Sequence, residues 1–145
     1  MAEPYCLAMV LCDAVHRDPG SNKFTILGTF SSVTAPDFPV QINLCVYYAI
    51  TDGLGPTTLS LQLIDGESGY LDPADEEPNP GRIFCAKSEF SFPSPLLILE
   101  GAMGVVTQLP KEGLYICELW ADRVPLMSRR LVARKLDLGH AEEIK

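Results

Sequence analysis

The stretch from residue 38 to residue 64 constrains the fold more than any other part of this chain. Apolar side chains occupy every second position from Val40 to Ile50, and the alternation resumes over residues 58–63. A period of two is typical of a strand that buries one face. The turn-forming segment 51–56, which contains two glycines and a proline, separates the two runs. Together they predict a long antiparallel hairpin with one buried face.

A hairpin with one apolar face is marginal in water, so a second sheet has to cover it. The rest of the chain offers further strand-like runs at intervals of about 8–12 residues, the spacing of a sandwich or barrel. No strand-like run alternates with a helical one, which argues against an α/β fold. These further runs span residues 5–16, 23–33, 82–92, 96–109, 114–121 and 126–136.

The predicted fold is therefore all-β: one antiparallel β-sandwich of about eight or nine strands, with immunoglobulin-like or jelly-roll topology. A single domain covers residues 1–145, with strands within 5–136 and a polar tail at 137–145. Residues 126–136 also fit an amphipathic helix, but the turn before them favours a strand. The predicted core contains Leu44, Val46, Tyr48, Leu59, Leu61, Leu63, Phe84, Tyr115, Cys117 and Leu119.

Glycine and proline positions refine this prediction. Residues 23–33 are expected to form one strand, paired with the first, and Gly28 inside it indicates a bulge or a close backbone approach. The two prolines of segment 34–39 favour an extended crossover between sheets. Gly101 and Gly104 predict a bend or bulge in the strand that contains them.

Composition limits the classes of function. The formal net charge is −8 and the pI is about 4.6, which disfavours nucleic acid and anionic membranes as partners. The N-terminal sequence lacks the basic region of a secretory signal, and no apolar run reaches the roughly 18 residues that span a bilayer. The five cysteines form no CxxC pair and lie in strand-like runs. Buried, reduced thiols in a cytoplasmic protein are the expectation.

Recognisable catalytic motifs are missing from the sequence. It contains no GxSxG, HExxH or Walker motif, and neither His16 nor His140 is placed beside a nucleophile by a known pattern. We therefore expect a protein that is not an enzyme and that uses no cofactor. An enzyme whose site is not visible in the sequence is the remaining alternative.

An acidic loop offers a weak calcium site. Calcium binds six to eight hard oxygen ligands, which loops at the end of a sandwich can present. The spacing matches no EF-hand, and prolines among scattered carboxylates are more typical of a solvated loop. The candidate ligands are Asp65, Glu67, Asp72, Asp75, Glu76 and Glu77.

Basic and aromatic residues near the C-terminal end suggest an interface. A positive stripe on a strand suits an acidic partner, although charge on an edge strand also serves to prevent aggregation. Trp120 and Ile116 share a face that is an apolar contact patch if outward and core if covered. The stripe contains Arg123, Arg129, Arg130, Arg134 and Lys135.

Three segments carry a resemblance to a known family. They are CDAVHRDPGSNKFTILGTFSSVTAPDFPV, VYYAITDGLGPTTLSLQLIDGESG and EGLYICELWADRVPLMSRRLVARKL. Together they resemble a bacterial family of small uncharacterised domains seen in planctomycetes, over roughly residues 10–135. The resemblance implies an immunoglobulin-like sandwich of unknown function and supplies no catalytic residues. The closing turn at residues 121–123 departs from the Asp-Gly of that pattern.

The leading hypothesis is an interaction or structural module that acts through a sheet face or edge. We expect a protein partner or a homo-oligomer, and neither nucleic acid nor a membrane. The interface candidates are Ile116, Trp120, Arg129, Arg130 and Arg134. A calcium-binding or small-ligand-binding sandwich that uses the acidic loop is the alternative.

Overall fold

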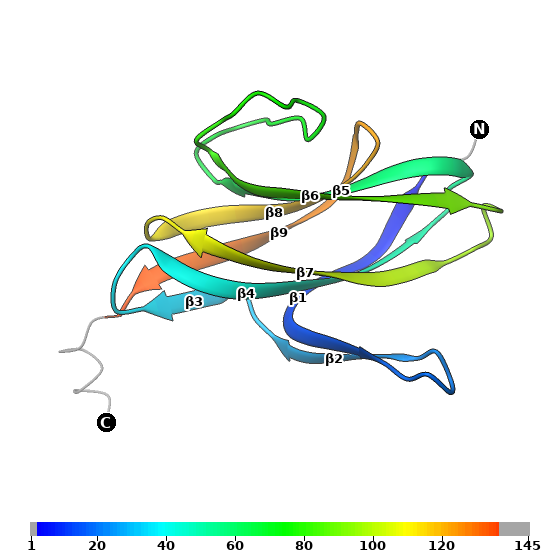
Figure 1. The fold of residues 1–145 in the computed structure, drawn as a ribbon, viewed down its shortest axis with the longest axis horizontal. Coiled ribbons are helices and arrows are strands. Elements are labelled where there is room, and N and C mark those ends of the chain that lie inside the picture. The colour runs from blue at the N-terminus through cyan, green and yellow to red at the C-terminus, as the bar shows by residue number, and fades with distance from the viewer. Residues whose placement is uncertain (1–2, 137–145) are drawn as a thin grey trace.

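The computed structural model describes residues 3–136, and within them it contains nine strands and no helix. The strands form two layers that pack face to face, as Figure 1 shows. The all-β prediction and the expected number of strands are confirmed. The strands are β1 (Tyr5–Arg17), β2 (Phe24–Thr29), β3 (Ser32–Ala35), β4 (Val40–Thr51), β5 (Gly55–Asp65), β6 (Arg82–Phe92), β7 (Leu99–Leu109), β8 (Gly113–Ala121) and β9 (Val124–Lys135).

One sheet has four strands in the order β2-β1-β4-β7, and the other has five in the order β3-β9-β8-β5-β6. The core lies between them. Nine of the ten predicted core residues are buried, and Phe84 is half-buried against the same cluster. The alternation of apolar residues therefore identified the inner faces correctly.

The predicted central hairpin is wrong, because its two arms lie in different sheets. β4 pairs with β1 and β7, whereas β5 pairs with β6 and β8. Asp52 adopts a positive φ of 64° at the connection, and Gly53 packs so tightly on Phe92 that an added Cβ would lie 2.5 Å from its ring. An apolar stripe can be buried by a strand across the core as well as by a neighbour, so alternation does not decide pairing.

The strand expected over residues 23–33 is split, and its two parts belong to different sheets. β2 pairs with β1 in antiparallel fashion, as predicted, and β3 then pairs in parallel with β9. The sandwich is therefore not wholly antiparallel. Gly28 confirms the expected close approach: its φ is +69°, and an added Cβ would lie 2.3 Å from a carboxylate oxygen of Asp13. The crossover at residues 36–39 carries the chain to the other sheet, as expected.

Two further predictions have clear outcomes. Residues 126–136 fall almost entirely in β9, so the strand interpretation is confirmed over the helix. Of the bend or bulge expected near Gly101 and Gly104, the bulge is wrong, because β7 pairs with β4 from Leu99 to Leu109 without a shift in register. Gly101 instead makes room for the Tyr48 hydroxyl, which would lie 2.7 Å from an added Cβ.

All five cysteines are free thiols. Cys6, Cys12 and Cys117 are buried, whereas Cys45 and Cys85 are only half-buried, so the expectation of full burial was wrong for two of them. Burial raises the pKa of the Cys117 thiol from 9.0 to about 12. No helix in the described part of the chain is long and apolar enough to cross a membrane. The predicted tail at 137–145, with His140, lies outside the described residues.

Candidate functional site

The two sheets leave a gap in strand pairing along one side of the sandwich. β2 pairs with β1 only from Cys12 onward, and β3 pairs with β9 only from Val132 onward. The N-terminal half of β1 and the N-terminal half of β9 therefore have no strand neighbour on their facing sides within residues 3–136. Edge strands of this kind present unpaired N–H and C=O groups. We call the hollow between these two edges the β1–β9 notch.

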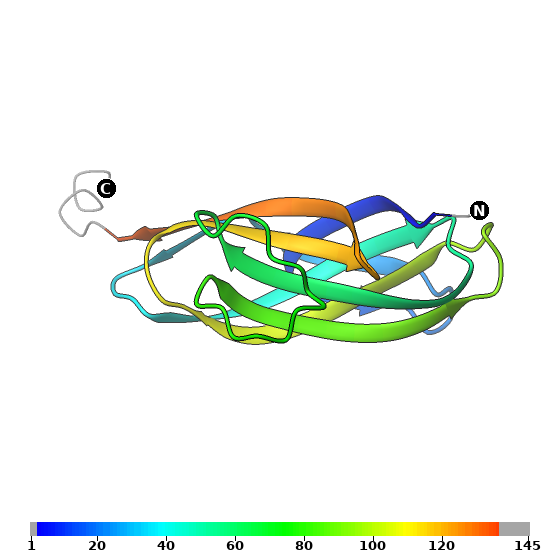
Figure 2. The ribbon, with the colours of Figure 1, turned by 90° about the horizontal axis from the view of Figure 1, so that it is seen from above.

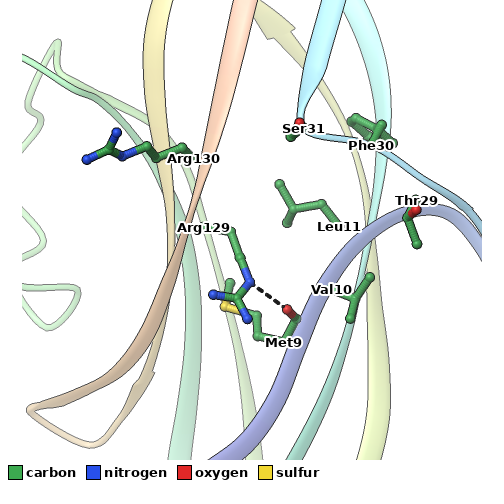
Figure 3. A pocket seen from close by; sticks show the side chains of 8 residues that line it. All are labelled: Met9, Val10, Leu11, Thr29, Phe30, Ser31, Arg129 and Arg130. Atoms are coloured by element: carbon green, nitrogen blue, oxygen red, sulfur yellow. Dashed lines mark hydrogen bonds between the residues drawn. The ribbon is translucent and has the colours of Figure 1, made fainter.

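The β1–β9 notch has a volume of about 370 Å³. Its floor forms where the chain leaves β2 for β3: the Phe30 N–H donates to the Leu11 carbonyl at 3.1 Å, and the Val132 N–H donates to the Ser31 carbonyl at 2.9 Å. Figure 3 shows the side chains that line it. They are Met9, Val10, Leu11, Thr29, Phe30, Ser31, Arg129 and Arg130.

Arg129 crosses the notch. It lies opposite Cys117 of β8, so its side chain leaves β9 on the same side as the core. Beside Arg129, β9 has no neighbouring strand on the side of the notch, so the guanidinium extends to β1 rather than into the core. Its Nε donates to the Met9 carbonyl at 2.9 Å (Figure 3). A second nitrogen donates to the Ser128 carbonyl at 3.4 Å. Both acceptors are neutral carbonyls, so these contacts leave the charge of Arg129 unbalanced.

The positive charge at the notch has no carboxylate partner in the described part of the chain. Across residues 3–136 the one ion pair is Lys111 with Asp65, at 3.4 Å, and it lies elsewhere. The charge of Arg129 also affects the Cys6 thiol. Burial raises the pKa of that thiol, and the positive charge of Arg129 partly offsets the rise. A positively charged edge on a protein of net charge −8 is suited to an anionic partner.

The five predicted interface residues do not form one surface. Arg129 points into the notch, whereas the side chain of Arg130 points away from it on the opposite face of β9, which is the alternation expected for a strand (Figure 3). Ile116 is the cross-strand neighbour of Arg130 and is half-buried. Arg134 lies beyond the notch, opposite Thr34 of β3.

Trp120 is covered. Only 1% of it is exposed, and the ring of Tyr70 packs edge-on against it with centroids 5.6 Å apart. Tyr70 belongs to the loop of residues 66–81, which folds over the outer side of the five-stranded sheet (Figures 1 and 2). Of the two readings that the sequence left open for Trp120, the structure shows the covered one, so Trp120 offers almost no surface to a partner.

A buried polar cluster under this loop was not predicted. Gln62 is fully buried, and its amide nitrogen donates to the Leu71 carbonyl at 2.7 Å and to Glu118 at 2.8 Å. Its amide oxygen accepts from Arg82 at 3.2 Å, and Arg82 also donates to the Asp72 carbonyl at 2.9 Å. The bonds to the Leu71 and Asp72 carbonyls fasten the loop to the sheet, and the bonds of Gln62 with Glu118 and Arg82 join neighbouring strands. No sequence pattern predicts this cluster, because Gln62 occupies an outward position in its strand.

The carboxylates of the acidic loop do not converge on one site. Asp65, Asp72 and Asp75 each accept a hydrogen bond from the backbone N–H two residues later, at 2.9–3.1 Å, which uses them to shape turns. Among the described residues, no three His, Cys, Asp or Glu side chains are placed to hold a metal ion. The structure therefore provides no geometric support for the calcium alternative.

Two facing sheets and a notch between strand edges define a β-sandwich domain with a sheet-edge candidate site. A model of a family of unknown function, DUF6941, matches residues 7–133, which is most of the chain. The chain belongs to that family. The predicted resemblance to a family of unknown function is confirmed to this extent, and the family's description assigns no activity. No match to a curated protein was found.

Proposed function

We propose that this protein is a non-enzymatic interaction module that binds an extended, acidic segment of a partner protein in the β1–β9 notch. The observation that carries the proposal is Arg129, which lies between two strand edges and has no carboxylate partner in residues 3–136. An extended segment that adds to a sheet edge gains main-chain hydrogen bonds, and the side chains beside the edge select its sequence. A carboxylate on the segment would pair with the guanidinium group of Arg129.

The apolar and hydroxyl groups of the notch suit the same occupant. Phe30 and Val10 can contact an apolar side chain of the segment, while Thr29 and Ser31 can hydrogen-bond its backbone. In such a complex Arg129 exchanges the neutral Met9 carbonyl for a carboxylate. The released carbonyl is then available to the incoming strand.

The test is selection of binding peptides from a random display library with the full chain as bait. We expect the selected peptides to be extended and enriched in Asp and Glu. Their affinity should fall about ten- to a hundredfold in the Arg129→Gln variant, since a hydrogen bond to a charged group contributes about 1.5–3 kcal/mol. Arg134→Gln is the matched control, because Arg134 lies on the same strand beside β3. Peptides without acidic residues, or unchanged affinity in Arg129→Gln, would refute the proposal.

We also infer an immunoglobulin-like topology. β4 and β7 would correspond to strands B and E of one sheet, and β9, β8, β5 and β6 to the order G-F-C-C′ of the other. A tyrosine corner supports this assignment: the Tyr115 hydroxyl, near the start of β8, donates to the Lys111 carbonyl at 2.6 Å. The five free thiols support a reducing compartment, and we propose the cytoplasm.

A further inference from the structure

β7 is an edge strand with an unusually open long side. It closes the four-stranded sheet, and it pairs with β4 along its full length of 11 residues without a bulge. In an edge strand every second residue directs its N–H and C=O away from the sheet. In the described part of the chain no strand takes up these groups, so β7 is a long template for another strand.

β7 also lacks the usual protection of an edge. Natural edge strands carry lysines, prolines or bulges, or they are short. β6, the edge of the other sheet, carries Arg82, Lys87 and Glu89, and β2 and β3 have only six and four residues. β7 contains one charged residue, Glu100, and that carboxylate accepts a hydrogen bond from the Tyr47 hydroxyl. Val106, 64% exposed, is open to solvent on the outer face.

We propose that a second copy of this chain pairs with β7, antiparallel and centred on Gly104, to join the two four-stranded sheets into one. The order across the dimer is β2-β1-β4-β7 followed by β7-β4-β1-β2 of the other copy. A two-fold axis through Gly104 makes the interface self-complementary, which is the usual form of a homodimer contact.

This register matches every position of β7 with a suitable partner. The opposing pairs keep the same face of the sheet, because each pair of positions differs by an even number. No like charges face each other. In order outward from the centre, the cross-copy pairs are Gly104–Gly104, Met103–Val105, Ala102–Val106, Gly101–Thr107, Glu100–Gln108 and Leu99–Leu109.

Neighbouring registers fit less well. Moving the centre to Met103 sets the charged Glu100 against Val106, and moving it to Val105 sets Glu100 against Pro110, which has no N–H to donate. With Gly104 at the centre, Glu100 instead faces the amide of Gln108, which donates hydrogen bonds to a carboxylate. The sequence of β7 therefore selects one register.

The first test changes the charge opposite Glu100. Gln108→Glu places two carboxylates face to face twice in each dimer, and Gln108→Lys places an ammonium there instead. Opposing cross-strand charges change pairing energy enough to predict a two- to about thirtyfold weaker dimer for Gln108→Glu and a tighter one for Gln108→Lys. Sedimentation over a range of protein concentrations measures both. A monomer at all concentrations, or equal effects of both substitutions, would overturn the proposal.

The second test cross-links the two copies at the proposed two-fold axis. Gly104→Cys introduces no clash, because an added Cβ meets no atom within 4 Å. Directly opposed residues have Cα atoms about 4.5–5.5 Å apart, within the range for a disulfide. Cys45 is the direct neighbour of Gly104 on β4 and would compete for the new thiol within one chain, so the substitution is made in a Cys45→Ser background. Mild oxidation with diamide should then give a covalent dimer. Val106→Cys is the control, since its two copies would lie about 13 Å apart along the strands. A covalent dimer from Val106→Cys but not from Gly104→Cys would refute this register.

Discussion

Two open edges in the described part of the chain, the β1–β9 notch and β7, are protected in opposite ways. At the β1–β9 notch an arginine points across the gap and occupies the Met9 carbonyl. Along β7 no basic residue, proline or bulge interrupts the edge, and its one carboxylate is held by Tyr47. An inward-pointing charge discourages a neutral or identical strand but attracts an acidic one. An uncharged, regular edge accepts a strand like itself.

This difference would allow one small domain to bind an acidic segment at the notch and a second copy of itself at β7 without confusing the two. A strand of the same chain that approached the notch would have to bury the guanidinium of Arg129 without a counter-charge, which is costly. A strongly acidic segment gains nothing at β7, where Glu100 would repel it. The two edges therefore differ in the charge of the strand that each accepts.

The largest expected effect on dimer affinity comes from adding lysines to β7, the residues that protect many natural edge strands. Ala102 and Val106 face each other across the proposed dimer, so Ala102→Lys with Val106→Lys brings like charges together twice. We expect the dimer to weaken by tenfold or more, as measured by sedimentation. Thr25→Lys with Leu27→Lys on β2 is the matched control and should leave the dimer unchanged. A dimer that survives the β7 substitutions would show that association uses another surface.

A smaller effect, on self-association, is expected from removing the charge of Arg129 at the notch. In the background of the two β7 lysines, Arg129→Leu leaves the Met9 carbonyl free and the notch apolar. We expect new, weak self-association, seen as scattered light that rises with concentration. Arg134→Leu, at the end of β9 already covered by β3, should not produce it. If Arg129→Leu stays monomeric, the charge of Arg129 does not prevent self-association at the notch.

The sequence predicted which residues face the core but not which strands are neighbours. Alternation placed Leu44, Val46 and Leu61 correctly, because burial of one face depends only on the local period of two. It could not tell that β4 and β5 face each other across the core, since that depends on where Phe92 packs against the connection. The position of Arg129 on β9 was likewise predictable.

The notch itself was not predictable, because it depends on long-range pairing. It exists where β2 leaves β1 and where β3 joins β9, and β3 and β9 lie about a hundred residues apart in the chain. The exposed edge of β7 depends in the same way on which strand ends the sheet. Trp120 shows the same limit: the sequence left open whether its face is outward or covered, and a loop distant from it in the chain covers it.

The smallest expected effect concerns the one carboxylate on β7. Burial, together with the hydrogen bond to Glu100, raises the pKa of Tyr47 from 10.0 to about 12. The folded state therefore disfavours ionised Tyr47, and its contribution to stability is complete below pH 10 and is lost as the pH rises toward 12. Urea unfolding should show a steeper loss of stability over this range for the wild type than for Tyr47→Phe. Equal slopes would mean that Tyr47 is not coupled to Glu100, and β7 would then carry a free charge at its edge.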